Sequence, residues 1–464
     1  TQRTESMIPR LRSTALLTGI FLCFPLADFA AGNERLRVIV ETDLGGDADD
    51  QASFVRFLLY SCEWDVEAII ADRHADDFHR DGARDHLGLK ASNGHELALA
   101  YLAAYGEVQP NLVKHRADFP TVEELVRVTV PGWNDTTAGV ERIIAAADRD
   151  DPRPIWYGNW GSNSGSRSNL QRAFDHVKES RGPAEYEALV RKFRIVTLDG
   201  EGPTRQGHEE HVLLHVETGY PTLDGGRWYH RFRPLTERAG GFDVTKDVRE
   251  NHGRLGALYT TPKEGDSWCF VYLIPTGLSD VNEPAWGGWA GRYGLRMGDK
   301  LNTKGPQTGE AFYWANARDT WNGTTNRDNT AARWAAALQN DFRARLDWCV
   351  APRFEEANHP PRVVCQGDDS TAVLRLEAAA GRPFLLTAEG TSDLDGDSLR
   401  YRWFHYPEPS SYAGSVKIEG AESPSAAVSL PGEAVGKTAH LVLEVSDAGS
   451  PPLTRYRRVV LSVK

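Results

Sequence analysis

Hydrophobic positions after residue 35 follow two patterns, continuous apolar runs and helical spacing. Residues 36–41 (LRVIVE) and 66–71 (VEAIIA) are nearly continuous apolar runs, as expected of strands buried on both faces of a parallel sheet. Between them, residues 51–60 have apolar side chains at helical spacing. The order strand, loop, helix, strand predicts a βαβ unit.

The same alternation continues along the chain. Helical spacing recurs near residues 137–148 and 169–179, and strand-like runs lie at 153–157 and 192–198. Strands that alternate with helices build a parallel sheet with helices on both faces. We therefore predict an α/β domain with a doubly wound, mostly parallel sheet over residues 34–351.

The pattern changes at a Pro-rich segment, residues 351–361. Beyond it, alternating runs such as FLLTAEGT, LRYRWFHY, HLVLEVSD and RRVVLSV are separated by turn residues. About seven such strands in roughly a hundred residues are typical of an immunoglobulin-like antiparallel sandwich, which we predict for residues 362–464. Its segment TSDLDGD, residues 391–397, can bind calcium, but such a sequence more often forms a polar turn.

Charge limits the partners. The 464 residues include 53 basic and 65 acidic side chains, a net charge of -12. This charge repels nucleic acid and an anionic membrane surface, so we expect neither as a partner. After residue 31 no segment is long and apolar enough to span a membrane.

The first residues have the character of a targeting segment. Arg10 and Arg12 precede the apolar run 14–27, which is too short to cross a bilayer and is followed by small residues. We predict a signal peptide over residues 1–31 and a secreted or periplasmic protein, with a buried N-terminal helix as the alternative.

Four cysteines follow the predicted signal peptide, and none has the CxxC spacing of zinc or redox sites. Cys349 and Cys365 flank the Pro-rich segment and are candidates for a disulfide in an exported protein. Their spacing alone does not establish the pair.

An acidic loop, within VIVETDLGGDADDQAS at residues 38–53, follows the first predicted strand. In an open parallel sheet the ligand site lies beyond the carboxyl ends of the strands. A solvated loop that caps the next helix is the ordinary alternative, but carboxylates so close repel one another unless a cation lies among them. Carboxylate oxygens suit a hard divalent cation, so we predict a metal site here. The carboxylates of the loop are Asp43, Asp47, Asp49 and Asp50.

The loop resembles the D-T-D-x-G-x-D-D signature of inosine-uridine-type nucleoside hydrolases, with Glu41 in place of the first aspartate and two residues inserted after the glycine. A closer resemblance is to an exported bacterial nucleoside-hydrolase-like family, sometimes described as cellulose-binding. It implies a sheet of nucleoside-hydrolase type and runs through both domains. The segments that carry it are TDLGGDADDQAS (42–53), DDPRPIWYGNWG (150–161), EGDSWCFVYLIPTGLSD (264–280), EPAWGGWAGRYG (283–294) and DLDGDSLRYRWFHY (393–406).

The resemblance implies calcium held by aspartates and cleavage of a bond at the anomeric carbon of a sugar. Asp43 then serves as calcium ligand and general base, Asp50 as a second ligand, and Asp49 as the residue that binds sugar hydroxyls. Asp266, ahead of a strand-like run, best matches a third aspartate ligand, although a turn residue beside Gly265 is an equal alternative.

Three further residues are candidates for substrate binding. Asn163, in the loop after the predicted strand 153–157, carries an amide for a metal or a sugar. Trp286 and Trp289, in the segment WGGWAGRY, either stack on sugar rings or fill a packed corner against glycine backbone. The resemblance also implies a histidine for the leaving group, for which no clear counterpart exists. His74, His79 and His252 are candidates, each also typical of a structural histidine.

These observations favour a secreted calcium-dependent hydrolase that cleaves an N- or O-glycosyl bond of a nucleoside or another carbohydrate. A second hypothesis is a non-catalytic carbohydrate-binding protein, with cellulose or another polysaccharide as partner, and a third is a structural surface protein. The retained Asp43, Asp49 and Asp50 favour the first hypothesis, because a protein that only binds needs no base beside a metal, and the missing histidine favours the second. Because of the two inserted residues, the resemblance implies no nucleobase specificity.

Overall fold

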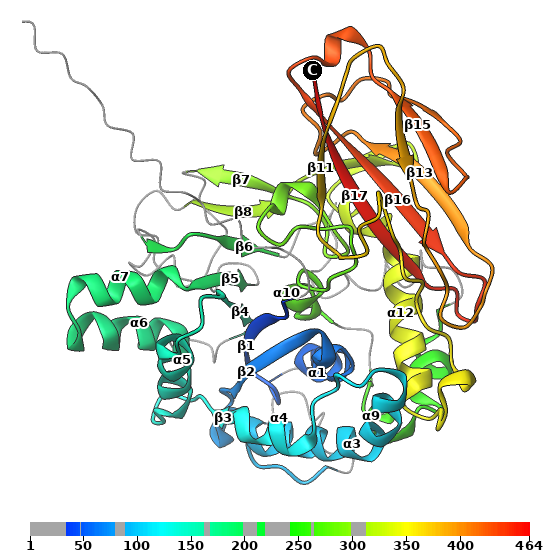
Figure 1. The fold of residues 1–464 in the computed structure, drawn as a ribbon. Helices are drawn as coiled ribbons and strands as arrows, with labels where there is room; N and C mark the ends of the chain where they lie inside the picture. The colour runs from blue at the N-terminus through cyan, green and yellow to red at the C-terminus, as the bar shows by residue number, and fades with distance from the viewer. Residues whose placement is uncertain are drawn as a thin grey trace, which may run out of the picture.

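The structure, a computed structural model, describes residues 34–46, 48–78, 89–161, 168–197, 211–218, 242–260, 264–297 and 312–464. It contains an α/β domain and a C-terminal β domain (Figure 1). The predicted signal peptide, residues 1–31, lies outside the described residues. In the ranges described, no helix combines the length and the apolar character that crossing a membrane requires.

The α/β domain is built on an eight-stranded sheet in the order β3-β2-β1-β4-β5-β6-β8-β7. All neighbouring strands are parallel except β7 and β8, which confirms the predicted mostly parallel sheet. The strands are β1 (Leu36–Thr42), β2 (Trp64–Ala71), β3 (Thr129–Pro131), β4 (Ile155–Asn159), β5 (Phe193–Thr197), β6 (His215–Glu217), β7 (Tyr293–Met297) and β8 (Phe312–Asn316).

Helices cover both faces of this sheet, as the unbroken apolar runs of the strands require. In β1, Val38 and Val40 face one hydrophobic core, whereas Ile39 faces a second core on the opposite face. The first core includes α1, α3 and α12, and the second includes α5, α6 and α7 (Figure 1). The helices are α1 (Ala48–Tyr60), α3 (Gly94–His115), α4 (Val122–Val128), α5 (Ala138–Asp148), α6 (Asn169–Ser180), α7 (Pro183–Arg191), α9 (Gly253–Ala257), α10 (Ser267–Val271), α11 (Asn329–Ala332) and α12 (Ala335–Trp348).

Helix α1 is buried along its length, from Asp49 to Tyr60. Its one basic residue, Arg56, lies in the core because Glu264 neutralises it, with Nε 2.5 Å from Oε2 and Nη2 2.8 Å from Oε1. Glu264 also accepts a hydrogen bond from Ser267 Oγ at 2.6 Å. These contacts fix the start of α10 against α1.

The segment after Asp266 is a helix, not the strand that its apolar run indicated. Residues Ser267–Val271 form α10, and each of them is buried. A short apolar run that is buried on all sides has no periodicity to distinguish helix from strand, which explains the wrong prediction.

The C-terminal domain consists of two sheets, β11-β17-β16-β13 and β12-β15-β14, around one hydrophobic core. The all-β prediction is confirmed, but β11 and β17 are parallel, a departure from a fully antiparallel arrangement. The immunoglobulin-like topology and the exact domain boundaries stay predictions. The strands are β11 (Leu374–Ala378), β12 (Phe384–Thr387), β13 (Arg400–Tyr406), β14 (Lys417–Glu419), β15 (Ser425–Ser429), β16 (Thr438–Ser446) and β17 (Thr454–Val463).

The two domains are joined by backbone hydrogen bonds. Tyr456 N donates to Thr276 O at 3.0 Å, and Arg458 N donates to Gly277 O at 3.1 Å. Gly277 has φ +82°, and a Cβ there would lie 1.9 Å from Tyr456 O, so the approach requires glycine. Strand β17 therefore docks directly on the α/β domain.

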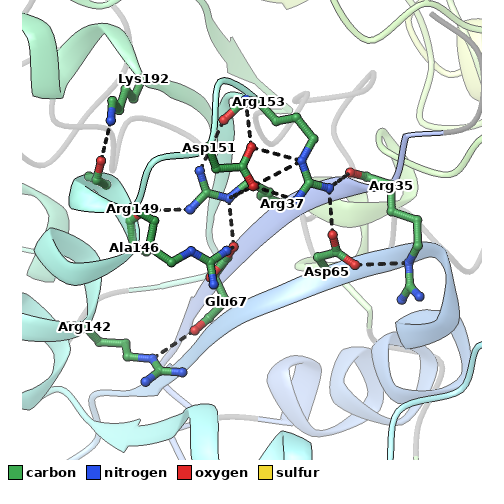
Figure 2. Close-up of polar contacts among 11 residues, drawn as sticks. Arg35, Arg37, Asp65, Glu67, Arg142, Ala146, Arg149, Asp151, Arg153 and Lys192 are labelled. Atoms are coloured by element: carbon green, nitrogen blue, oxygen red, sulfur yellow. Dashed lines mark hydrogen bonds and ion pairs between the residues drawn. The ribbon is translucent and has the colours of Figure 1, made fainter.

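Charged side chains form a network at the amino ends of β1, β2 and β4 (Figure 2). Arg37, fully buried, has Nε 2.8 Å from Glu67 Oε1 and 3.6 Å from Asp151 Oδ2. Arg153 lies 2.7 Å from Asp65 and 2.7 Å from Asp151 (Figure 2). Each carboxylate in this network has at least one arginine partner, so the charges at this end of the sheet are neutralised.

The four cysteines in the described residues are buried free thiols. Cys349 and Cys365 therefore form no disulfide, and the link between the domains is held by other contacts. Burial raises the pKa of the Cys365 thiol to about 11, which keeps it protonated at neutral pH.

Candidate functional site: a carboxylate cluster

The site lies at the carboxyl end of β1, in the middle of the sheet. Strand β1 pairs with β2 on one side and β4 on the other, so the order of the strands reverses at this point. Such a reversal separates the loops at the carboxyl ends of the two strands and leaves room for a ligand. Asp43 follows β1 directly, and Asp49 and Asp50 lie in the first turn of α1.

Three carboxylates converge here. A side-chain oxygen from each of Asp49, Asp50 and Asp266 lies within 4.8 Å of the others, and each residue is at most 3% exposed. Asp266 comes from a segment far along the chain, the residue before α10, which packs against α1 and β4 (Figure 1). Among the ranges that the structure describes, no other group of three acidic, cysteine or histidine side chains has this geometry.

The cluster carries an electrostatic cost. Burial raises the pKa of Asp50 well above its ordinary value, and the negative charges of Asp43 and Asp266 raise it further. Thr42 opposes the shift, because its hydroxyl donates a hydrogen bond to Asp50 Oδ1. Asp50 therefore tends to take up a proton, or needs a cation, to remain in this position.

Asp43 contacts an arginine as well as a neighbouring aspartate. It contacts Asp50, but it also forms an ion pair with Arg73, the second residue after β2. Gly46 makes space for the guanidinium, since a Cβ there would lie 2.1 Å from Arg73 Nη2. Burial alone would lower the pKa of Arg73, but the charges of Asp43, Asp72 and Asp50 outweigh it and raise the pKa.

Sequence reasoning missed Arg73. The available signal was its position, since it follows the predicted strand 66–71 just as Asp43 follows the first strand. The carboxyl ends of adjacent parallel strands meet at one edge of a sheet. Without the strand order, however, the sequence did not show that the two segments are neighbours.

Glu41, at the position of the first signature aspartate, has a structural role. It is fully buried and accepts hydrogen bonds from the Tyr157 hydroxyl and from the backbone N and Nδ2 of Asn169, the latter two at 3.0 and 3.1 Å. Burial raises the pKa of Glu41, and these hydrogen bonds oppose the rise. The carboxylate thus holds the first residue of α6.

Trp286 and Trp289 contact the C-terminal domain. The Trp286 ring lies edge-to-face with His440 at 4.9 Å between centroids, and the Arg375 guanidinium lies 4.5 Å above it. Trp289 is 2% exposed, with the Arg455 guanidinium 5.8 Å from its ring. These contacts support the packed-corner interpretation of the segment over the sugar-stacking interpretation.

Of the candidate histidines, His74 lies beside the cluster because it follows Arg73. Its side chain is 38% exposed, and its ring lies edge-to-face with Trp133 at 5.7 Å. His252 instead lies 3.1 Å from Asp347 Oδ1, which is a structural pairing. The candidates that fall outside the described residues are Asp47, His79 and Asn163.

Three carboxylates within this span form a donor set suited to a hard divalent cation. Calcium takes oxygen ligands in flexible geometry, whereas zinc favours nitrogen and sulfur. The side chains therefore fit calcium, with Asp43 and Arg73 at the edge of the group.

Comparison with known proteins places these features in context. Residues 37–212 and 233–293 match the family model described as cellulose-binding Sde182, nucleoside hydrolase-like domain, and residues 383–463 match that of the C-terminal domain of cellulose-binding protein Sde0182. A solved structure, a nucleoside hydrolase-related hypothetical protein from Saccharophagus degradans associated with carbohydrate metabolism, is 32% identical. The match covers 93% of this chain and 100% of that one, with a TM-score of 0.73. No curated protein matches the chain.

Proposed function

This chain belongs to the family of the cellulose-binding, nucleoside hydrolase-like protein Sde182, and from this premise we propose that it is a calcium-dependent hydrolase of glycosyl bonds. The observation that carries the proposal is the convergence of Asp49, Asp50 and Asp266 at the carboxyl end of β1. A group of buried carboxylates at that point is costly for folding and is explained by a bound cation.

Each aspartate has a proposed role. Asp50 and Asp266 would hold calcium, and Asp49 would share its oxygens between the cation and sugar hydroxyls. Calcium would supply the positive charge that lowers the pKa of a water. Asp43, in contact with Asp50, would accept the proton of that water. The negative charge of the cluster would stabilise the positive charge that develops at the anomeric carbon.

The charge of the site also limits the substrate class. Asp43, Asp49, Asp50 and Asp266 lie close together here, and Arg73 pairs with Asp43. A neutral glycoside or nucleoside is compatible with this charge, whereas a sugar phosphate or an acidic sugar is repelled. We therefore propose a neutral carbohydrate as substrate, with an insoluble polysaccharide such as cellulose as a further partner.

A second function, carbohydrate binding without catalysis, is favoured by one specific observation. The ion pair with Arg73 engages the carboxylate of Asp43 that would act as the base. A binding protein tolerates this pairing, but a hydrolase must release Asp43 from Arg73 when substrate and calcium are bound.

A panel of ribosides, aryl glycosides and plant oligosaccharides distinguishes these functions. The parent should hydrolyse at least one substrate with calcium present and lose activity on chelation. Asp43→Asn should lose about 10²–10⁴-fold in kcat, the usual contribution of a general base, yet still bind calcium. Asp76→Asn is the matched control, because its side chain is 90% exposed in the loop after β2. No turnover across the panel, together with retention on cellulose, would establish the binding function.

Export is proposed from the N-terminal sequence, in which Arg10 and Arg12 precede the apolar run 14–27. Expressed in a bacterium with its own N-terminus, the chain should lose about its first thirty residues and leave the cytoplasm. Recovery of the uncleaved chain from the cytoplasm would contradict export.

A further inference from the structure

A second set of carboxylates lies where the linker between the domains meets the β domain. Asp393 is in the loop before β13, and Asp447 follows β16 directly. Both loops contact consecutive linker residues, Asn358 and His359. None of these residues belongs to the cluster at the end of β1.

One carboxylate oxygen of Asp447 accepts hydrogen bonds, and the other has no hydrogen-bond partner among the residues that the structure describes. The residue is 2% exposed, and its Oδ1 accepts hydrogen bonds from Gly449 N at 2.9 Å, Leu453 N at 3.0 Å and Asn358 Nδ2 at 3.1 Å. Its Oδ2 is buried and has no hydrogen-bond partner. A buried carboxylate oxygen without a donor is costly unless a cation or a proton meets it.

Asp393 has the same arrangement. Its Oδ1 accepts hydrogen bonds from Asp395 N at 2.9 Å and Asp397 N at 3.0 Å, which close the loop. Its Oδ2 is buried and has no hydrogen-bond partner. The loop is thus a turn, as its sequence predicted, and it still presents one carboxylate oxygen for a ligand.

Two consecutive linker residues contact the loops that carry these two carboxylates. Asn358 Nδ2 donates to Asp447 and, at 2.7 Å, to Pro451 O. The next residue, His359, contacts Asp395 through its backbone N at 2.7 Å and through Nδ1 at 2.9 Å. Burial raises the pKa of Asp447, and the negative charge of Asp393 raises it further, as expected of neighbouring carboxylates.

We propose that Asp393 and Asp447 bind a calcium ion through their buried Oδ2 atoms, at the junction of the linker and the β domain. Calcium suits the site because it accepts carboxylate, carbonyl and water oxygens in irregular geometry. With two carboxylates the affinity should be that of extracellular calcium modules, a Kd of about 10⁻⁴–10⁻³ M. The ion would tie the loops on either side of Asn358 and His359 to the linker and so stabilise the β domain.

Calcium titration of the intact protein tests this site. Equilibrium dialysis should find one ion fewer on Asp393→Asn/Asp447→Asn than on the parent. The Tm of the parent should rise by several degrees with calcium. In the double variant, calcium should no longer raise the Tm of the β domain. Glu422→Gln, an exposed carboxylate of the same domain, is the matched control and should behave as the parent does.

The variants remain informative because asparagine keeps the acceptor oxygen that receives the backbone N–H groups. Without calcium, Asp447→Asn should be at least as stable as the parent, since it removes the repulsion with Asp393. Asp50→Asn separates the two sites, because it removes calcium binding at the α/β cluster alone. If the double variant binds as many calcium ions as the parent, or if acidification stabilises the β domain while calcium does not, a shared proton occupies the site and the proposal is wrong.

Discussion

The two ends of the central sheet differ in how their buried charges are paired. At the amino ends of β1, β2 and β4, arginines and carboxylates alternate (Figure 2), and the fully buried Arg37 contacts both Glu67 and Asp151. The side-chain hydrogen bond of Arg153, with further hydrogen bonds and nearby positive charge, lowers the pKa of Asp151 despite its partial burial. Charge at this end stabilises the fold because each carboxylate has a partner of opposite sign.

At the carboxyl end of the same strand, the balance is reversed. Asp49, Asp50 and Asp266 lie together, and Arg73 pairs with the neighbouring Asp43. The pKa of Asp50 is raised by burial and by its acidic neighbours, so its negative charge destabilises the fold. Paired arginines and carboxylates thus stabilise the fold at the amino end. At the carboxyl end carboxylates lie beside one another, and a bound cation would neutralise them.

The largest expected effect comes from the amino end. Arg37→Met should lower the free energy of unfolding by about 3 kcal/mol or more, because it leaves Glu67 and Asp151 without their fully buried partner. Urea denaturation followed by circular dichroism measures the change. The double variant Arg37→Met/Glu67→Met should lose less than the sum of the two single variants, since neither charge is then left alone. An additive result would show that the pair is not coupled.

At the carboxyl end, removing a charge should stabilise the protein rather than destabilise it. Asp50→Asn should stabilise the calcium-free protein at neutral pH, because burial and the charges of Asp43 and Asp266 raise the pKa of Asp50 and so disfavour its charged form in the folded state. The same variant should lose the stabilisation by calcium. Differential scanning calorimetry with and without calcium measures both. Destabilisation of the calcium-free protein by Asp50→Asn would refute this account of the cluster.

The stability of the calcium-free protein should also depend on pH through Asp50. Well below pH 3.8, the ordinary pKa of aspartate, Asp50 is protonated in both the folded and the unfolded chain, and it imposes no penalty. As the pH rises from its ordinary pKa of 3.8 through the raised folded pKa, the unfolded chain releases the proton first, so stability falls. The difference in stability between Asp50→Asn and the parent should therefore grow from pH 4 upward. A constant difference would mean that Asp50 does not titrate as described.

Much of the α/β fold was predictable because its signals are local. The run 36–41 is apolar on both faces, and the structure buries those faces in two separate cores. The acidic loop follows that run, so the position of the site at the strand end followed from sequence and topology alone. Helix α10 was mistaken for a strand because uniform burial removed its periodicity.

The residues that complete the site depend on long-range contacts. Asp266 was found through a family resemblance, since nothing in its own segment shows that α10 packs on α1. Arg73 required the strand order, and the contacts of Trp286 required the position of the C-terminal domain. A glycine-rich segment with tryptophans is the same in sequence whether it meets a sugar or another domain.

The smallest predicted effect concerns a second arginine on the same carboxylate oxygen. Arg149 pairs with Oε1 of Glu67, as Arg37 does, but the Arg149 side chain is 52% exposed. Water screens an exposed charge and the side chain loses conformational freedom on pairing, so Arg149→Ala should cost less than about 1 kcal/mol. That cost should largely disappear in 1 M NaCl, whereas the cost of Arg37→Met should persist because salt does not reach the buried charge. Equal losses for the two variants at both salt concentrations would show that pairing, rather than burial, determines the contribution of each arginine to stability.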